Sequence, residues 1–427
     1  MYEVSEYFLE NLDKKYHSLR GTITIKTDEG NVVTVFDENN LQSNSFSISS
    51  QCVSGSAFEI GAVCSKELNM VLILPEIKEY ALMGAEIFVE FGLETDTDNE
   101  FEWVPLGKFY VTKPKKRRDY TEITACDAVG LLDMTDDVEV PVAKWLTGTH
   151  QPYDMLEIIC GYAGVQIGST REEIETLPNG TLYTYVPEDT EISSTRDIIS
   201  YLAVFLGGFV TTNRDGGIII RQHKQASQTI LGNNMMKSNT TAVSDFQMII
   251  CGLIIYLDEG QSWGKSWYPD DEGKPNSVIL DVSDNPFFVG YYLLQPVETR
   301  LNNITEIILN DIAVHARYVP WIPFECEFYG NPAIDAGDCV IVENYDGNTI
   351  NSIVSHFTYR FRNTQKIRCS GEDSRILKGV RTENKRLYEV LEKKINNARG
   401  IPVTQAEFDQ LKLSGGLIEG AVYNIIG

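Results

Sequence analysis

The chain has 427 residues, of which 36 are basic and 61 acidic, so its formal net charge is −25. A chain of this length is too long for one hydrophobic core, and about three or four domains are expected. The acidic excess argues against tight nucleic-acid binding, which needs basic side chains to replace the counterions of the phosphates. The same charge suits a surface past which DNA slides without sticking, and it equally suits simple solubility.

The composition is that of a folded protein, with 43% hydrophobic and 10% aromatic residues. No apolar run approaches the roughly 20 residues that span a membrane. Residues 1–20 are polar and acidic and lack the apolar core of a signal peptide. We therefore expect a protein that is made in the cytoplasm and has no membrane span.

The first part of the chain has the period of two that is typical of strands. After an N-terminal extension, residues 1–17, Thr22–Lys26 alternates between polar and apolar residues. Asp28–Asn31 has the composition of a turn, and Val32–Phe36 follows as a second strand. Similar runs continue, so residues 18–137 predict an all-β domain, which is a tube-like barrel or a sandwich.

The period becomes helical between residues 138 and 224. Apolar residues recur at three-four spacing around Met155 and Ile159, and Thr170 with Glu173 has the form of a capping box. Ser194 is placed as the cap of a further helix. Asn213–Gly217 then has the composition of a hairpin turn between two apolar runs. This segment predicts a small α/β domain.

Residues 225–372 return to β structure and are predicted to include a second tube-like β domain. Within them, residues 261–275 are rich in Gly, Ser, Trp and Asp and predict a long exposed loop. Leu301–Arg317 mixes strand and turn signals. The expected fold class is therefore mainly β, with two tube-like β-barrel domains, a small α/β insert and a C-terminal helix.

That helix is predicted for residues 373–400, followed by an attachment tail over residues 401–427. Its apolar residues follow three-four spacing and resemble a short coiled coil, in which a polar core position would set the register. An ordinary amphipathic helix that packs on its own domain explains the pattern equally well. The candidate oligomer contacts are Leu377, Val380, Asn384, Leu387 and Leu391.

A short pattern occurs twice, far apart in the chain. Gly84–Glu90 is echoed by Gly337–Glu343, and each copy leads into an aromatic-led hairpin that ends at a cysteine, Cys126 or Cys369. Three chains with two such units each would present six, so that a three-fold object could seat on a six-fold one. Any two antiparallel hairpins can look alike, and that interpretation is about as strong from the sequence.

The chain carries no catalytic signature. Its five histidines lie in unrelated contexts, none near a nucleophile motif, and no phosphate-binding glycine loop follows a strand. The eight cysteines form no Cys-x-x-Cys pair and are expected to be buried reduced thiols. We therefore predict a non-enzymatic protein without catalytic, cofactor-binding or metal-ligating residues.

Two charged segments need an explanation. Asp96, Asp98 and Glu100 alternate at a hairpin tip and could hold calcium, but a solvated turn is the more common reason for such a pattern. Lys113–Arg118 is a basic run that could meet an acidic neighbouring subunit. A hairpin tip that is kept soluble and protected from edge pairing is again the more common explanation.

The order of β domain, α/β insert, β domain and helix resembles the baseplate hub, or tail-tip hub, of phage tails and phage-derived tail-like particles of Gram-positive bacteria. The likeness extends over about residues 18–372 and is made of family-like phrases. These phrases are Arg20–Ile23, Ile48–Cys52, Phe58–Val63, Trp103–Val111, Thr195–Asp197, Leu206–Phe209, Asn213–Gly216 and Gly330–Asp338.

The resemblance implies a homotrimeric ring with pseudo-six-fold symmetry at the tip of a virion or of a tail-like bacteriocin. Its partners would be the hexameric tail tube or distal tail protein, the tape-measure protein, and a tip, spike or fibre protein. Val403–Asp409 resembles short segments that end near such attachments. Longer members carry wall-cleaving domains, so that activity would come from a partner here.

Two other functions stay open on the sequence. Paired carboxylates are abundant, so a wall-degrading enzyme on a β scaffold is one alternative. A receptor-binding tail module that uses the 261–275 loop is the other. The hub interpretation predicts a structural protein that joins the tail tube to the tip and gates the channel when the host cell is infected or its membrane punctured.

Overall fold

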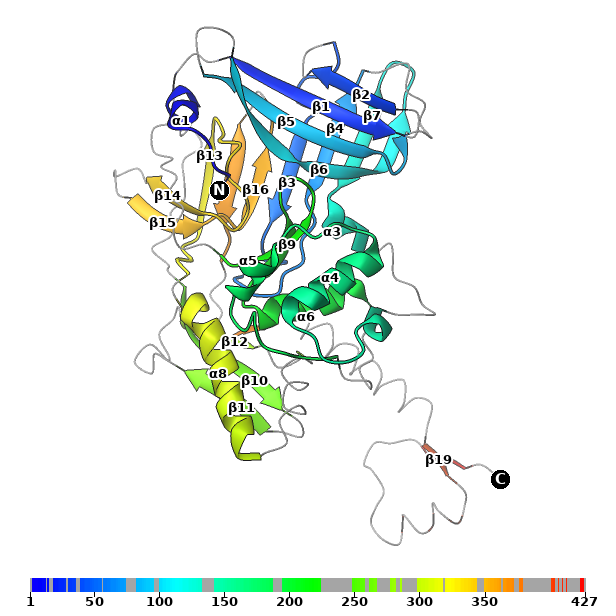
Figure 1. Ribbon diagram of the computed structural model, residues 1–427, viewed down its shortest axis with the longest axis vertical. Helices are drawn as coiled ribbons and strands as arrows, with labels where there is room; N and C mark the ends of the chain where they lie inside the picture. Colours follow the sequence, from blue (N-terminus) through cyan, green and yellow to red (C-terminus); the bar gives the residue numbers. More distant parts are fainter. Residues whose placement is uncertain are drawn as a thin grey trace. The chain divides into compact units, whose positions relative to one another are not determined.

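Most of the strands predicted from alternating residues are present in the computed structural model, and they build one large sheet (Figure 1). The chain divides into two compact units, Met1–Leu377 and Lys378–Gly427. The structure describes residues 2–12, 14, 18–27, 30–35, 39–55, 57–73, 82–95, 100–132, 142–186, 194–223, 248–257, 261–266, 277–281, 285, 298–317, 319–343, 349–361, 364–371, 376–378, 401–403, 406, 409, 412 and 423–425.

The large sheet has ten strands in the order β13-β17-β16-β3-β4-β7-β6-β5-β1-β2. Neighbouring strands pair antiparallel throughout. The bounds are β1 Leu19–Thr27, β2 Gly30–Val35, β3 Ser47–Gln51, β4 Glu67–Leu72, β5 Glu86–Glu94, β6 Phe101–Lys116, β7 Thr121–Cys126, β13 Phe324–Phe328, β16 His356–Tyr359 and β17 Gln365–Cys369.

The long strand β6 belongs to two parts of this sheet. Its first half, up to Tyr110, pairs with β5, and its second half, from Tyr110, pairs with β7. A bulge between Val111 and Lys113 marks the change of partner. Such bulges increase the local twist and bend a strand, which lets one strand serve two differently directed parts of a sheet.

The repeat predicted from the sequence is present as a repeated set of strand pairings. The first copy consists of β4, β5, β6 and β7, which pair as β4–β7, β5–β6 and β6–β7. The second copy consists of β13, β14 (Cys339–Glu343), β15 (Thr349–Ile353), β16 and β17. It pairs as β13–β17, β14–β15 and β16–β17, so β15 and β16 together correspond to β6.

Hydrogen bonds at the start of each echo confirm the equivalence residue by residue. In both copies the backbone amide of the glycine in the echo donates to the carbonyl of a valine. The amide of that valine donates to the carbonyl of the residue that follows the glycine. These bonds are Gly84 to Val111 (2.9 Å) and Val111 to Ala85 (3.0 Å) in the first copy, and Gly337 to Val354 (2.8 Å) and Val354 to Asp338 (2.9 Å) in the second.

A hydroxyl group closes the bend in both copies. Thr112 Oγ1 donates to the carbonyl of Thr124 at 3.2 Å, and Ser355 Oγ donates to the carbonyl of Arg368 at 3.0 Å. The two hairpin cysteines do not correspond, however. The buried Cys369 matches Ala125 in the pairing register, whereas Cys126 lies one residue later and is half-buried. That part of the predicted echo was wrong by one position, which in a strand places the side chain on the opposite face.

The two copies share one sheet among the described strands, because β3 joins them. On one side β3 pairs with β4 of the first copy, and on the other side it pairs with β16 of the second. The sequence predicted two β domains but gave no sign of this junction. Pairing between distant segments leaves no local pattern, because each strand keeps the same alternation whatever its neighbour is.

The α/β insert has the elements that the sequence predicted. They are α4 Pro152–Ala163, α5 Arg171–Glu175, α6 Thr195–Phe205, β8 Phe209–Thr212 and β9 Ile218–Arg221. Two short helices that were not predicted, α3 Ala128–Leu131 and η2 Val142–Trp145, come before them. The capping box of Thr170 and Glu173 is formed, and Ser194 accepts a hydrogen bond from the amide of Asp197 at 3.3 Å as predicted for a helix cap.

Two predictions between residues 225 and 372 were wrong. The loop expected over residues 261–275 is contradicted in its first part, because Gln261–Ser266 is strand β11 and pairs with β10 (Ile249–Leu257). Residues 267–275 lie outside the described residues. On its other side β10 pairs with β12 (Ser277–Asp281). Leu301–Arg317 was expected as strand and turn, but residues 301–316 belong to helix α8 (Glu298–Ala316). Its buried residues recur at three-four spacing, so burial outweighs the weak helix preference of its β-branched residues.

The C-terminal helix prediction is contradicted where it begins. Leu377 lies in strand β18 (Ile376–Lys378), next to β12 in the sheet order, because the backbone here is extended and pairs in a sheet. The other candidate contacts, Val380, Asn384, Leu387 and Leu391, lie outside the described residues. In the second unit β19 (Ile401–Val403) pairs parallel with β20 (Tyr423–Ile425). None of the described helices is long and apolar enough to cross a membrane.

Candidate functional site

One face of the large sheet is polar over the strands from β13 to β7. The side chains of this polar face alternate with buried ones, as expected for an antiparallel sheet that packs on a core with one side only. We define the polar face by Ser47, Ser49, Gln51, Glu67, Asn69, Glu122, Thr124, Glu325, Glu327, His356, Thr358, Lys366 and Arg368. The residues of the opposite face are buried by the chain itself and are mostly apolar.

The strand register lines these polar side chains up in rows. Glu327, Lys366, Thr358, Ser49 and Glu67 are successive cross-strand partners on five neighbouring strands. This row passes from the second copy into the first without a break. Acidic and basic residues are mixed along it, although the whole chain is strongly acidic.

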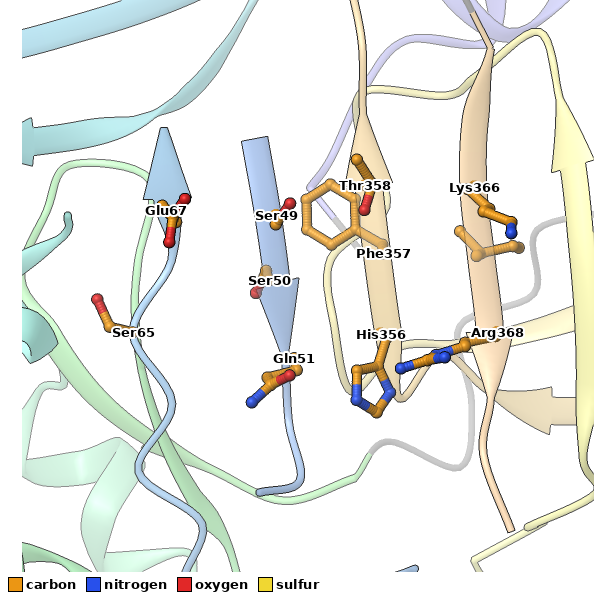
Figure 2. Close-up of a pocket in the computed structure, with 11 residues that line it drawn as sticks. Ser49, Ser50, Gln51, Ser65, Glu67, His356, Phe357, Thr358, Lys366 and Arg368 are labelled. Atoms are coloured by element: carbon orange, nitrogen blue, oxygen red, sulfur yellow. The ribbon is translucent and has the colours of Figure 1, made fainter. Parts of the chain in front are cut away.

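A shallow pocket of about 400 Å³ lies on the polar face where β3 meets β16 (Figure 2). His356 and Arg368 come from the second copy and Gln51 from β3, and their side chains lie together at one end of the pocket. Burial, together with the positive charge of Arg368, lowers the pKa of His356 to about 4. The imidazole is therefore neutral at pH 7.

A serine and a histidine meet here, but their hydrogen bonds are those of a structural pair. Ser355 Oγ lies 2.8 Å from His356 Nδ1, accepts the amide of Ser370 at 2.9 Å and donates to the carbonyl of Arg368. Ser355 is fully buried and is not among the residues that line the pocket. A nucleophile needs an exposed oxygen and an oriented base, so this hydroxyl serves the bend of the strand.

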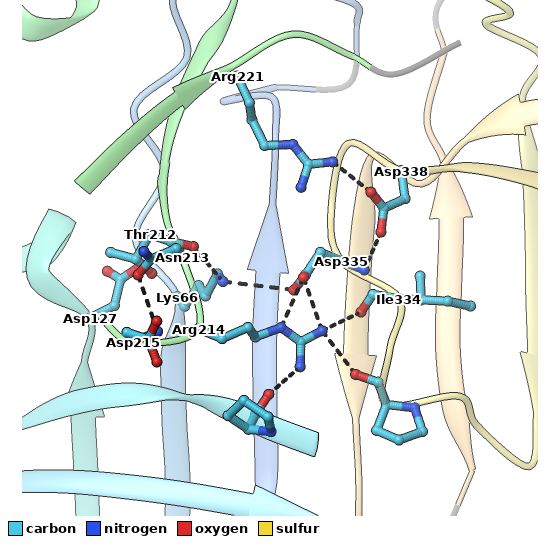
Figure 3. Close-up of polar contacts among 12 residues, drawn as sticks. Lys66, Asp127, Thr212, Asn213, Arg214, Asp215, Arg221, Ile334, Asp335 and Asp338 are labelled. Carbon is cyan, nitrogen blue, oxygen red and sulfur yellow. Dashed lines mark hydrogen bonds and ion pairs between the residues drawn. The ribbon is translucent and has the colours of Figure 1, made fainter. Parts of the chain in front are cut away.

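A buried ion cluster joins the two copies to the α/β insert (Figure 3). Its members are Lys66, Asp127, Arg214, Arg221, Asp335 and Asp338. Arg214, on the turn between β8 and β9, places Nε and Nη2 each 2.9 Å from Asp335 Oδ2. The same guanidinium donates to the carbonyls of Pro105, in β6, at 2.6 Å and of Pro332 at 2.9 Å.

The other members extend the cluster to both sides. Lys66 Nζ donates to the carbonyl of Thr212 at 3.0 Å and lies 3.7 Å from Asp335 Oδ1. Asp127 accepts from the hydroxyl of Thr212 at 2.9 Å. Arg221 Nη2 lies 2.6 Å from Asp338 Oδ1. Every charged member has a partner on another segment, so the cluster defines one relative position of the two copies.

The pKa values in the cluster show which charges are held. Burial alone would raise the pKa of Asp335, but Arg214 and Lys66 hold it well below its ordinary value. Burial raises the pKa of Asp127 even though Lys66 opposes this change, and burial also lowers the pKa of Lys66. The pair of Arg214 and Asp335 is therefore the strongly ionised centre of the cluster.

The sequence did not assign a role to the residues of this cluster. Arg214 and Asp335 stood in family-like phrases, as parts of turns, and nothing local linked them over 121 residues of sequence separation. The sequence signal that could have indicated a buried ion pair was a charged residue inside a turn that is flanked by apolar strands. Of the acidic residues considered for calcium, Asp96 and Asp98 lie outside the described residues, and no group of three or more acidic, histidine or cysteine residues in the described part could hold a metal ion.

Comparisons with known proteins find similar solved structures but no similar sequence. No family model and no curated protein sequence matches the chain. The prophage tail protein gp18 from Listeria monocytogenes EGD-e is similar in structure, with 12% identity, 87% of this chain and 99% of that chain covered, and a TM-score of 0.48. The 43 kDa tail protein of prophage MuSo2 from Shewanella oneidensis has 12% identity, covers 83% and 99%, and has a TM-score of 0.45.

A chain of the p2 virion baseplate in its activated conformation is a third similar structure, with 11% identity, coverage of 84% and 100%, and a TM-score of 0.31. The structural neighbours are phage tail and baseplate proteins. This is the group that the sequence phrases resemble.

Proposed function

We propose that this chain is a non-enzymatic structural protein of a phage tail or tail-like particle, in which it forms the hub of the tail tip or baseplate as a homotrimeric ring. The observation that carries the proposal is the repeated set of strand pairings, together with the β3–β16 junction between the copies. Three chains would present six equivalent units, which fits a six-fold tail tube or distal tail protein.

The free edges of the sheet favour closure into a ring. The β16 strand of the second copy has β17 on one side and β3 on the other. The corresponding part of β6, residues 113–116, pairs with β7, and no described strand lies on its other side. At the far end of the described sheet, β13 is the last strand of the second copy. A neighbouring chain at these edges would cover exposed strand edges, which otherwise invite unwanted pairing.

The polar face would line the channel of such a ring. The apolar face is covered by the chain itself, so the polar face is the one that remains for an aqueous lumen. Its mixed charges offer DNA neither a continuous basic track to bind nor a uniform acidic wall. In this proposal the ring passes DNA, or is closed by the tape-measure, tip, spike or fibre protein that it contacts, until infection begins.

Native mass spectrometry tests the ring directly. The expected species has three times the chain mass of 48.0 kDa, and particle images should have three-fold symmetry with six similar wall segments. Hubs can require neighbours to trimerise, so the tail-tube and distal tail proteins of the same particle are added in a second arm. A monomer in both arms that binds neither protein would refute the proposal.

The enzymatic alternative has a separate test. The purified chain is incubated with bacterial cell walls, and release of soluble sugar or peptide is measured. The hub proposal expects no turnover. Turnover that one carboxylate substitution abolishes would establish the alternative.

A further inference from the structure

The pocket at the β3–β16 junction has different chemical groups at its two ends. Arg368, His356 and Gln51 are successive cross-strand neighbours, and their side chains lie at one end (Figure 2). Glu67 also lines the pocket, but it lies three strand positions away from Arg368, which is about 14 Å at the usual strand spacing. The end that contains Arg368 can therefore be treated as a site of its own.

Arg368 is a cation without a carboxylate partner. Its cross-strand neighbour on β13 is Glu325, but the carboxylate of Glu325 is bound by Lys366. The guanidinium of Arg368 forms no ion pair or hydrogen bond with the residues that the structure describes. Although the chain has a net charge of −25, this end of the pocket therefore offers a positive charge that is available to an anion.

The two neighbours of Arg368 add hydrogen-bond acceptors. Ser355 Oγ has one proton and donates it to the carbonyl of Arg368 at 3.0 Å, so His356 Nδ1 donates to Oγ at 2.8 Å. Because this imidazole is neutral at pH 7, its Nε2 keeps a lone pair. Gln51 Nε2 donates to Cys64 Sγ at 3.7 Å, and Oε1 of the same amide remains an acceptor.

We infer that this end of the pocket is a binding site for a carboxylate-bearing segment of another protein. The carboxylate would pair with Arg368, and N–H groups of the same segment would donate to His356 and Gln51. The hydroxyl groups of Ser49 and Thr358, which also line the pocket, can bond further backbone groups. The binding groups belong to this chain alone, whereas the position of the pocket on a channel wall rests on the proposed ring.

A protein segment fits these groups better than the phosphate backbone of DNA. A phosphodiester only accepts hydrogen bonds, so it would satisfy Arg368 but leave the two acceptors without donors. Glu325 and Glu67 lie on either side of the cation along the face, and a long polyanion would be repelled as it passes them. A protein segment can present one carboxylate to Arg368 and neutral groups to the surrounding residues.

The site occurs in only one copy of the repeat. His356 pairs with Arg368 in the second copy, and the pair at the matching position of the first copy is Lys113 with Thr124. The first copy therefore has neither the imidazole nor the guanidinium at this position. In a trimeric ring the site would occur three times, so a partner that uses it would have three-fold rather than six-fold symmetry.

Nuclear magnetic resonance of the histidine rings tests the site on the isolated chain. The imidazole signal of His356 is assigned with His356→Gln and is followed during titration with N-acetyl-glutamate N′-methylamide at pH 7 and constant ionic strength. The corresponding glutamine compound lacks the charge, and dimethyl phosphate offers a phosphodiester instead of a carboxylate. The titrations are repeated with Arg368→Gln and with Lys144→Gln, which removes the same charge at an exposed position outside the polar face.

We expect the glutamate compound to shift the His356 signal saturably, with a dissociation constant on the order of millimolar because one exposed contact is weak. Arg368→Gln should weaken this binding at least about tenfold, and Lys144→Gln should change it less than about twofold. No saturable shift in the wild-type chain, an equal shift with the glutamine compound, or equal losses in the two variants would overturn the inference. Tighter binding of dimethyl phosphate would also overturn it and would assign the site to a phosphodiester.

The pKa of His356 reports separately on the position of the cation. Removal of the positive charge in Arg368→Gln should raise this pKa, and an unchanged value would contradict the placement of Arg368 beside the imidazole and with it the site. The titration needs no neighbouring chain. Failure of the ring in native mass spectrometry and failure of this site are therefore separate outcomes.

Discussion

Removal of the Arg214 side chain should destabilise the whole first unit, because this residue is the centre of the buried ion cluster. Arg214→Met keeps much of the length of the side chain but removes its charge and its donors. Among the described residues, the change leaves Asp335 with Lys66, at 3.7 Å, as its remaining ion-pair partner. It also removes the donor for the carbonyls of Pro105 and Pro332.

The expected cost follows from this geometry. Arg214 is 8% exposed, and removal of one partner from a buried ion pair costs about 3–5 kcal/mol because the other charge stays buried. We expect the free energy of unfolding to fall by about 4 kcal/mol. Asp335→Asn should be costly too, and the double variant should cost less than the sum of the single variants, since no unpaired charge of this pair remains.

The pH dependence gives a second readout with a defined sign. In wild type the pKa of Asp335 is below its ordinary value, so the stabilisation is present above that ordinary value and is lost as pH falls through the folded-state pKa. In the variant, burial without Arg214 raises this pKa. Protonation then relieves the buried charge, and the stability deficit of the variant should shrink between pH 7 and pH 4.

Urea unfolding followed by tryptophan fluorescence and by circular dichroism measures these effects. Arg117→Met is the matched control, because Arg117 forms an exposed ion pair with Glu122. Its expected change is within about 0.5 kcal/mol. A loss below about 1 kcal/mol for Arg214→Met, or a deficit that grows on acidification, would refute the reasoning. Coincidence of the two probes has to be checked, since a chain of this length can unfold in steps.

Two further predictions use the described residues. Burial lowers the pKa of His223 to about 3. The protein is therefore fully stable with respect to this group above the unfolded-state pKa of histidine and loses free energy of unfolding as pH falls toward 3. The free energy of unfolding should depend less steeply on pH between pH 6 and pH 4 in His223→Gln, and an unchanged slope in urea titrations would contradict this. The equivalent glycines Gly84 and Gly337 both have positive φ, +74° and +87°, but an added Cβ meets open space at Gly84 and lies 2.4 Å from Phe209 Cζ at Gly337. Gly84→Ala should lower the free energy of unfolding by about 1 kcal/mol through backbone strain, and Gly337→Ala should lower it by at least about 2 kcal/mol more. Urea unfolding measures both variants, and equal midpoints would be inconsistent with the described packing.

The elements that could be predicted from the sequence are those with a local cause. The capping box of Thr170 and Glu173 is formed because both partners lie within one helical turn. The strands of the first copy follow from alternation alone. Helix α8 was missed because its β-branched residues favour strands, and only their burial on one side shows that the segment is helical.

The candidate site was predicted in part. The echo of Gly84 and Gly337 indicated a repeat, and the structure has the same pairings and hydrogen bonds at both places. The polar face and the ion cluster could not be predicted, because Arg214 and Asp335 belong to separate turns whose sequences carry no information about each other. Nothing in a strand pattern states which distant strand will be its neighbour.

The sequence by itself determined the local periods, the helix caps, the turns and the doubled β unit, since each of these depends on residues a few positions apart. The tertiary structure alone decided that β3 joins the two copies, that their polar residues form one face, and that three cations and three carboxylates meet in one buried cluster. The physical reason is the distance along the chain over which each interaction acts. Backbone preferences and capping act within a turn or a strand, whereas sheet edges and buried charges are satisfied by whichever distant segment folding brings to them.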